Sequence, residues 1–180
     1  MKATGIVRRI DELGRIVVPK EIRRTLRIRE GDPLEIYTDR EGEIILKKYS
    51  SVREMNSFAK QYTDSLAQVS GKIALIADRD HFIAASGGMK GLMGKHISKE
   101  VERRMEKRET VVAKQGEKSF AALSEDDNEC VSEAFSPILC EGDVVGAVFI
   151  VSTDAKEIVG DVERKLVMSA ASFLGKQMEL

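Results

Sequence analysis

Arginine is the residue type that points most clearly to chemistry in this sequence, and it is concentrated near the N-terminus. Residues 1–30 carry nine basic and four acidic side chains, whereas the 180-residue chain has a net charge of −1. Planar guanidinium groups donate paired hydrogen bonds to phosphates and to guanine base edges. The segment therefore predicts contact with a polyanion, and double-stranded DNA is the partner that we expect.

The candidate DNA contacts fall into two groups. The leading group lies on a predicted hairpin and on the helix after it, and it consists of Arg8, Arg15, Arg23 and Arg24. A second group of positively charged residues ranks below these as DNA contacts, and it consists of Arg9, Lys2 and Arg27. The alternative is that the helical arginines form only a solvated face of a folding unit.

The elements that must carry these arginines are short. Residues 6–10 and 15–18 are rich in β-branched side chains and predict two strands joined by a turn. Pro19 suits the first turn of a helix, which we expect over residues 19–28. Gly31 is expected to end that helix.

A second hairpin is predicted directly afterwards. Residues 33–38 alternate apolar and polar side chains, and residues 43–48 return after a turn. Residues 1–50 thus form a β-β-α-β-β unit whose core is too small for a lone chain to fold stably. We expect them to fold as an obligate homodimer.

Residues 51–70 predict an amphipathic helix that links this unit to the rest of the chain. Apolar side chains recur at spacings of three and four, with Ser50 or Ser51 as N-cap and Gly71 as the end. Its apolar stripe can pack on the downstream domain or against a second copy of the helix. Because the stripe spans fewer than three heptads, packing on the downstream domain is favoured.

Residues 71–180 predict an α+β sandwich of small-domain size. The strongest hairpin pairs residues 133–140 with 144–151. The other expected strands are 72–77, 81–85, 110–113 and 120–123, and the expected helices are 98–107 and 157–178. An acidic loop covers residues 124–130, and a glycine-rich loop covers residues 86–94.

From the sequence we expect neither an enzymatic activity nor a cofactor or metal site. A thiol reductase is the catalytic alternative, but Cys130 has acidic neighbours and Cys140 lies on an apolar strand, where we expect a core residue. His81 and His96 are separated in the sequence and lack a ligand spacing with the cysteines, so no zinc site is expected. The glycine-rich loop lacks a phosphate-loop motif.

The remaining composition predicts a cytoplasmic protein that does not enter a membrane. Hydrophobic residues make up 42% of the chain and charged residues 33%, and no apolar run is long enough to span a bilayer. The N-terminus carries no export signal, and two cysteines in such a chain suggest a reducing compartment.

Residues 1–50 closely resemble the AbrB-like transition-state regulators of spore-forming bacteria. The resemblance rests on the run from Lys2 to Leu26, on Gly31 to Ile36 and on Ile44 to Tyr49. It implies an N-terminal swapped-hairpin β-barrel, in which two chains intertwine and present Arg8, Arg15, Arg23 and Arg24 to DNA. It also implies a transcriptional regulator of sporulation genes, either activating or repressing.

The same resemblance, extended by the acidic C-terminal region, implies a GAF-like domain for sensing and oligomerisation. Such domains bind small molecules under covering loops, here residues 86–93 and the acidic loop before Cys130, and the ligand is unknown. We expect a homotetramer assembled through the C-terminal helices, with a dimer as the alternative. A second hypothesis is a small-molecule sensor whose N-terminal region only assembles it.

Overall fold

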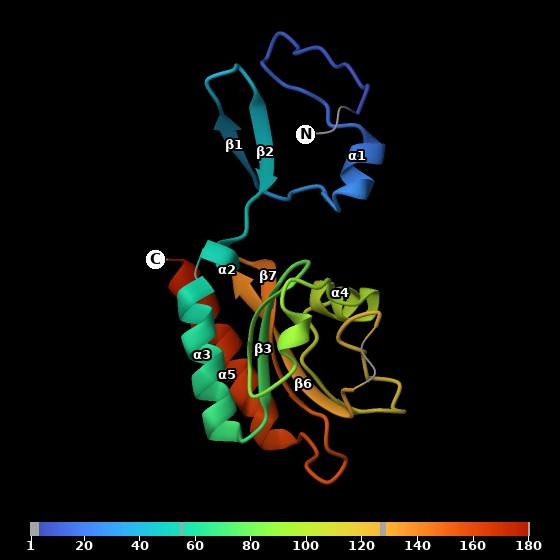
Figure 1. Ribbon diagram of the computed structural model, residues 1–180, viewed down its shortest axis with the longest axis vertical. Helices are drawn as coiled ribbons and strands as arrows, with labels where there is room; N and C mark the ends of the chain where they lie inside the picture. The colour runs from blue at the N-terminus through green and yellow to red at the C-terminus, as the bar shows by residue number, and fades with distance from the viewer. Residues whose placement is uncertain (1–3, 55, 127–128, 180) are drawn as a thin grey trace. The chain divides into compact units, whose positions relative to one another are not determined.

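The chain divides into two units, Met1–Tyr49 and Ser50–Leu180 (Figure 1). The computed structural model describes residues 4–54, 56–126 and 129–179. Within these residues, no helix combines the length and apolar character that crossing a membrane requires. Each unit is described separately below.

An antiparallel hairpin is the regular core of the first unit. Strand β1 (Leu34–Thr38) pairs with β2 (Ile44–Lys48), with Ile36 opposite Leu46. The turn between them is closed by Asp39, whose Oδ1 accepts hydrogen bonds from the backbone N–H groups of Glu41 (3.0 Å) and Glu43 (2.8 Å). The predicted second hairpin is therefore confirmed.

The predicted first hairpin is wrong in one respect, because only its turn is formed. The N–H of Gly14 donates to the carbonyl of Asp11 (3.0 Å), and the N–H of Asp11 donates to the carbonyl of Arg15 (3.1 Å). Residues 6–10 and 15–18 are not strands within the described part of the single chain. β-branched composition favours extended backbone, but a ladder also needs a partner strand, which composition cannot supply.

Helix α1 (Lys20–Thr25) is shorter than predicted, with Leu26 as its C-cap, and Arg27 rather than Gly31 takes the left-handed position that ends it. Arg27 takes a left-handed φ of 51°. The N–H of Ile28 donates to the carbonyl of Arg23 (2.7 Å), and that of Arg27 donates to the carbonyl of Arg24 (3.3 Å). These bonds form a Schellman motif, which normally uses glycine at the left-handed position. The prediction failed because an arginine occupies that position.

A five-stranded antiparallel sheet organises the second unit, in the order β4-β3-β7-β6-β5. Its strands are β3 (Ile73–Asp78), β4 (Phe82–Ser86), β5 (Val111–Lys114), β6 (Ser132–Cys140) and β7 (Asp143–Ser152). In the central pair, Phe135 lies opposite Phe149. The predicted hairpin of residues 133–140 and 144–151 is thus confirmed.

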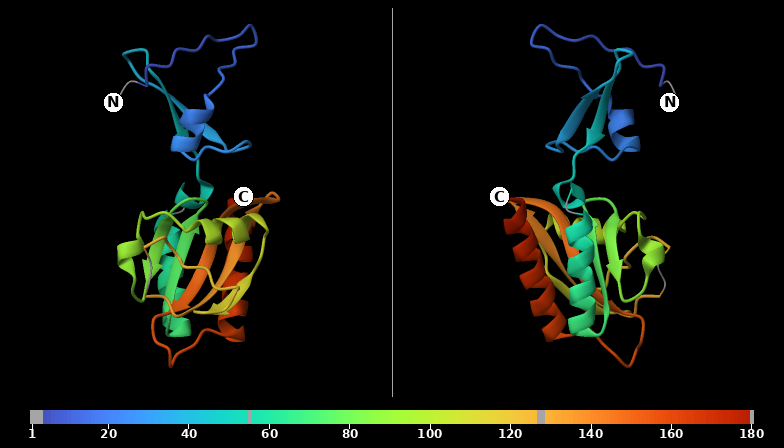
Figure 2. Two further views of the ribbon diagram at one scale, coloured as in Figure 1. Left: turned by 90° about the vertical axis from the view of Figure 1, so that its right-hand side faces the viewer. Right: turned by 60° about the vertical axis from the view of Figure 1, so that its left-hand side comes forward.

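Helices cover both faces of this sheet, which confirms the predicted α+β class. Helices α2 (Ser51–Glu54), α3 (Asn56–Ser70) and α5 (Asp161–Met178) pack on one face, and Figures 1 and 2 show α3 and α5 side by side there. Helix α4 (Lys99–Glu106) and the short helix η1 (Lys90–Leu92) cover the other face. Two apolar cores result, one on each side of the sheet.

Two local predictions for the second unit are wrong. Residues 120–123 are irregular instead of a strand, because the N–H of Ala121 donates to the Glu133 carboxylate (2.6 Å) rather than to a neighbouring strand. Helix α5 begins at Asp161 instead of residue 157, where the Glu163 carboxylate accepts from the N–H of Gly160 (2.8 Å). The predicted cap of α4 is confirmed, since Ser98 accepts from the N–H of Val101 (3.1 Å).

Candidate nucleic-acid interface

Asp11 builds the turn that positions Arg15. Its Oδ1 accepts hydrogen bonds from the backbone N–H groups of Leu13 (3.0 Å) and Arg15 (2.8 Å). Its Oδ2 lies 2.8 Å from Nε of Arg15, and this ion pair is open to solvent. Gly14 adopts the left-handed φ of 77° that the turn needs. The carboxylate thus fixes both the backbone and the guanidinium of Arg15.

This contact also changes how Asp11 titrates. Hydrogen bonds from the backbone and then the side chain of Arg15 hold the pKa of the Asp11 carboxyl below its ordinary value. Asp11 therefore stays charged at neutral pH. A phosphate that binds the Arg15 guanidinium must compete with this carboxylate.

Helix α1 places two further arginines together on the surface. Pro19 precedes the helix with a φ of −58° and is buried. Arg23 and Arg24 lie in the last turn, and both are exposed. Positive charge in a last turn complements the partial negative charge of the carbonyl end, so the helix tolerates both cations.

The structure separates the predicted contacts by exposure. Those open to solvent are Arg8, Arg9, Arg15, Arg23 and Arg24. Arg27 is half-buried, and its carbonyl accepts a hydrogen bond from Nζ of Lys48 (2.9 Å), which ties the end of α1 to β2. Lys2 lies outside the described residues. Arg27 therefore has a structural part in this unit that sequence reasoning missed.

Large apolar side chains are exposed on the same unit. Val7 is 85% exposed, Leu13 70% and Val17 74%, and on the β hairpin Ile36 is 67% and Ile44 62% exposed. Soluble monomers rarely expose many apolar side chains in so small a unit. The first unit thus combines cationic side chains with apolar surface of the kind that a protein partner covers.

The two cysteines of the second unit differ from the prediction in their burial. Cys130, expected in an acidic loop, is buried in the core on the α4 face, and Cys140, expected in the core, is half-buried at the end of β6. Burial, followed by the negative charges of Glu179, Glu141 and Asp143, raises the pKa of the Cys140 thiol. A raised pKa disfavours the reactive thiolate at this position.

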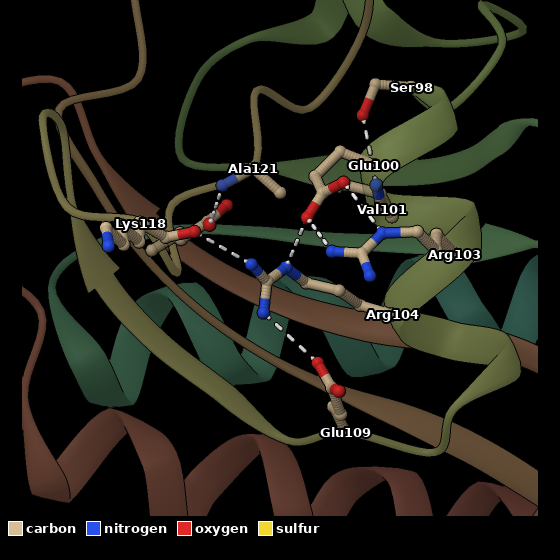
Figure 3. A network of polar contacts seen from close by, with 9 residues as sticks. Ser98, Glu100, Val101, Arg103, Arg104, Glu109, Lys118 and Ala121 are labelled. Carbon is tan, nitrogen blue, oxygen red and sulfur yellow. Dashed lines mark hydrogen bonds and ion pairs between the residues drawn. The ribbon is translucent and has the colours of Figure 1, made fainter.

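The α4 face of the sheet is held by an arginine network (Figure 3). Nε of Arg104 lies 2.9 Å from Glu100, its Nη1 lies 3.1 Å from Glu109, and its Nη2 donates to the carbonyl of Lys118 (2.9 Å). A hydrogen bond from Arg103, aided by Arg104, holds the pKa of Glu100 below its ordinary value. The network fastens α4 to the segments that follow it.

Sequence reasoning missed two features of this face. Glu133 is a fully buried carboxylate on β6 that accepts a hydrogen bond from the N–H of Ala121 (2.6 Å). His81 and His96, which are separated in the sequence, are neighbours with ring centroids 4.1 Å apart. The position of Glu133 at the start of a predicted apolar strand was the available signal for the first feature, whereas no spacing rule signals the second.

Comparison with known proteins decides the family. Residues 54–179 match the family described as "Stage V sporulation protein T C-terminal, transcription factor". The chain is also 53% identical over 180 residues to stage V sporulation protein T of Bacillus subtilis (strain 168), and the match covers 99% of each chain. The chain belongs to this family of transcription factors. The predicted relationship to sporulation regulators is confirmed.

The two units also have relatives of their own. Residues 7–54 match the family described as "Antidote-toxin recognition MazE, bacterial antitoxin". Transition state regulatory protein AbrB of Bacillus subtilis (strain 168) is 52% identical over 75 residues, which are 42% of this chain and 77% of AbrB. The predicted AbrB-like character of the N-terminal unit is therefore confirmed.

A solved structure supports the predicted fold of the second unit. The GAF domain of the Acinetobacter phosphoenolpyruvate-protein phosphotransferase superposes with a TM-score of 0.57 at 12% identity. The match covers 73% of this chain and 84% of that one. At this identity the likeness concerns the fold, and it confirms a GAF-like second unit.

Proposed function

We propose that this family member is a homodimeric regulator that binds double-stranded DNA upstream of sporulation genes, activating or repressing them. Arg8, Arg9, Arg15, Arg23 and Arg24 are the main contacts in this proposal, with Lys2 and Arg27 as secondary contacts. The observation that carries it is the exposure of the five main arginines on a unit that also exposes apolar side chains. Guanidinium groups suit both phosphates and guanine edges.

Dimerisation through residues 1–50 accounts for the apolar exposure. In a swapped-hairpin β-barrel, residues 6–10 and 15–18 would gain partner strands from the second chain. That pairing would bury side chains such as Val7 and Val17, which are among the most exposed apolar residues of the first unit. The spacing of arginines from the two chains would then be set by the intertwined dimer.

We further propose that the outer face of α3 and α5 joins two dimers into a tetramer. Tyr62 on α3 stacks on Phe173 of α5 with ring centroids 5.6 Å apart, and Phe58 lies 6.0 Å from Tyr62. Phe173 is 41% exposed and Met168 is 42% exposed, so the two helices present an apolar surface. Phe173→Glu should convert a tetramer to a dimer in a mass measurement, and an unchanged mass would rule out this face.

We assign one role to each of the three predicted segments of the chain. Residues 1–50 bind DNA, residues 51–70 form the linking helix that packs with the C-terminal domain, and residues 71–180 sense and oligomerise. An unidentified small molecule is the signal in this proposal, and the site of action is the cytoplasm. Thiol catalysis has no place in it, because Cys130 is buried and the pKa of Cys140 is raised.

Salt dependence is the direct test of DNA binding. The affinity of the full chain for a duplex selected from a random pool should fall steeply as the salt concentration rises. The cationic side chains of the bound protein displace counterions from the phosphates, and added salt opposes that release. An affinity that is absent, or indifferent to salt, would overturn the proposal. In that outcome the N-terminal unit serves only assembly, and the chain is a small-molecule sensor.

A further inference from the structure

The turn between β3 and β4 gathers side chains that ligate metals. Asp78 and Asp80 are buried, at 5% and 7% exposure, and His81 keeps part of its ring in solvent. One possible ligand atom from each of the three lies within 4.8 Å of the other two. Carboxylate oxygen combined with imidazole nitrogen suits zinc and related transition metals, whereas magnesium and calcium prefer oxygen alone.

A second imidazole reaches the same place from a different segment. The N–H of Phe82 donates to the carbonyl of Lys95 (3.1 Å), and residues 94–97 therefore run antiparallel beside the turn. His81 and His96 form a β-bridge there, with ring centroids 4.1 Å apart and ring planes inclined by 34°. The His96 ring thus lies against His81, the one imidazole of the three-residue cluster, without any regular spacing in the sequence.

We propose that Asp78, Asp80 and His81 bind a divalent transition metal of the zinc class, with the His96 ring packed against the His81 ligand. Two carboxylates of low exposure beside one imidazole form a donor set that attracts a divalent cation. The His81 side chain is 29% exposed, which gives an ion a route of entry to the cluster.

The contraction that a bound ion requires is small for the one donor pair whose distance is known. Four donors at about 2.1 Å from a tetrahedral ion lie about 3.4 Å from one another. The Nδ1 atom of His81 is 3.9 Å from Oδ1 of Asp78, so this pair must close by about 0.5 Å to reach that tetrahedral spacing. The Asp78 Oδ1 atom accepts from the N–H groups of Asp80 (2.8 Å) and His81 (2.7 Å), which fixes the turn around the donors.

Metal binding would connect two parts of the second unit. The glycine-rich segment between β4 and Lys95 lies between the two histidines in the sequence. An ion held by His81, whose ring packs against that of His96, would restrain both ends of that segment. Metal occupancy is therefore expected to stabilise the α4 side of the sheet.

The test uses the two histidines of the chain as separate probes. Zinc chloride is added to the full chain while the imidazole NMR resonances and the melting temperature are followed. Both resonances should shift and saturate at one zinc per chain, and the melting temperature should rise. Magnesium chloride should shift neither resonance. His81→Gln and Asp80→Asn should each weaken zinc binding by about tenfold or more.

Cys140→Ser is the matched control, because Cys140 carries a half-buried thiol, a group of a type that binds zinc, outside the proposed site. This variant should bind zinc as the wild-type chain does. Histidine resonances that stay unchanged in the wild-type chain would overturn the proposal, and this measurement needs no variant to fold. Equal zinc affinity in wild-type and His81→Gln chains, or binding lost in Cys140→Ser, would overturn it too.

Discussion

Replacing Arg24 with glutamine should change how DNA binding depends on salt. The side chain is exposed in the last turn of α1, and a dimer carries two copies. Each phosphate neutralised by a cation contributes about −0.9 to the slope of log affinity against log salt. If both copies contact phosphates, Arg24→Gln should make the slope less negative by about 1.8. The loss of affinity should be greatest at low salt.

Arg40→Gln is the matched control for this measurement. Arg40 lies exposed in the turn between β1 and β2, so the substitution removes the same charge from the same unit. Fluorescence anisotropy of a selected duplex over a salt series gives the slope for each full-length variant. Equal slopes for the two variants would show that only net charge matters. An Arg24→Gln chain that fails to fold would instead assign Arg24 a structural role.

Three further predictions concern other contacts. Asp11→Asn should raise DNA affinity at constant salt, because the Arg15 guanidinium, now paired with that carboxylate, becomes available to phosphate. Gly175→Ala should lower the free energy of unfolding by about 1–3 kcal/mol in denaturant titration, since a Cβ there would collide with the Leu139 carbonyl oxygen. The Glu100 pKa is lowered by folding, so its stabilising contribution is present above the ordinary value of 4.5 and disappears as pH falls through the lowered folded value. Glu100→Gln should therefore flatten the acid limb of stability against pH.

Each of these predictions has its own control. Glu12→Gln removes a neighbouring exposed carboxylate and should raise DNA affinity less than Asp11→Asn does. An equal rise would trace both effects to net charge. Gly91→Ala adds a Cβ that meets no atom within 4 Å, and it should leave the free energy of unfolding nearly unchanged. A Glu100→Gln chain with an unaltered acid limb would remove Glu100 as the source of that pH dependence.

The sequence predicted the second unit well because its elements are local and strongly patterned. The continuous apolar run of β7 predicts that strand, and in the first unit the alternation of residues 33–38 predicts β1 in the same local way. Ser98 is an N-cap residue type and correctly predicted the start of α4. Local chemistry was sufficient at each of these positions.

Predictions failed where a distant group decided the structure. The strand expected at residues 120–123 is displaced because Glu133 captures the N–H of Ala121. His81 and His96 are adjacent because residues 94–97 lie beside the turn after β3. No residue spacing in the sequence predicts this contact. Composition likewise favours strands at residues 6–10, but it cannot provide the chain against which they pair.

Native mass spectrometry of the full chain bound to a selected duplex tests the central proposal most directly. If the DNA surface is built from two intertwined copies of residues 1–50, complexes should contain two or four 20.0-kDa chains per duplex at every protein concentration. A stable, salt-sensitive complex of one chain with one duplex would contradict the proposal.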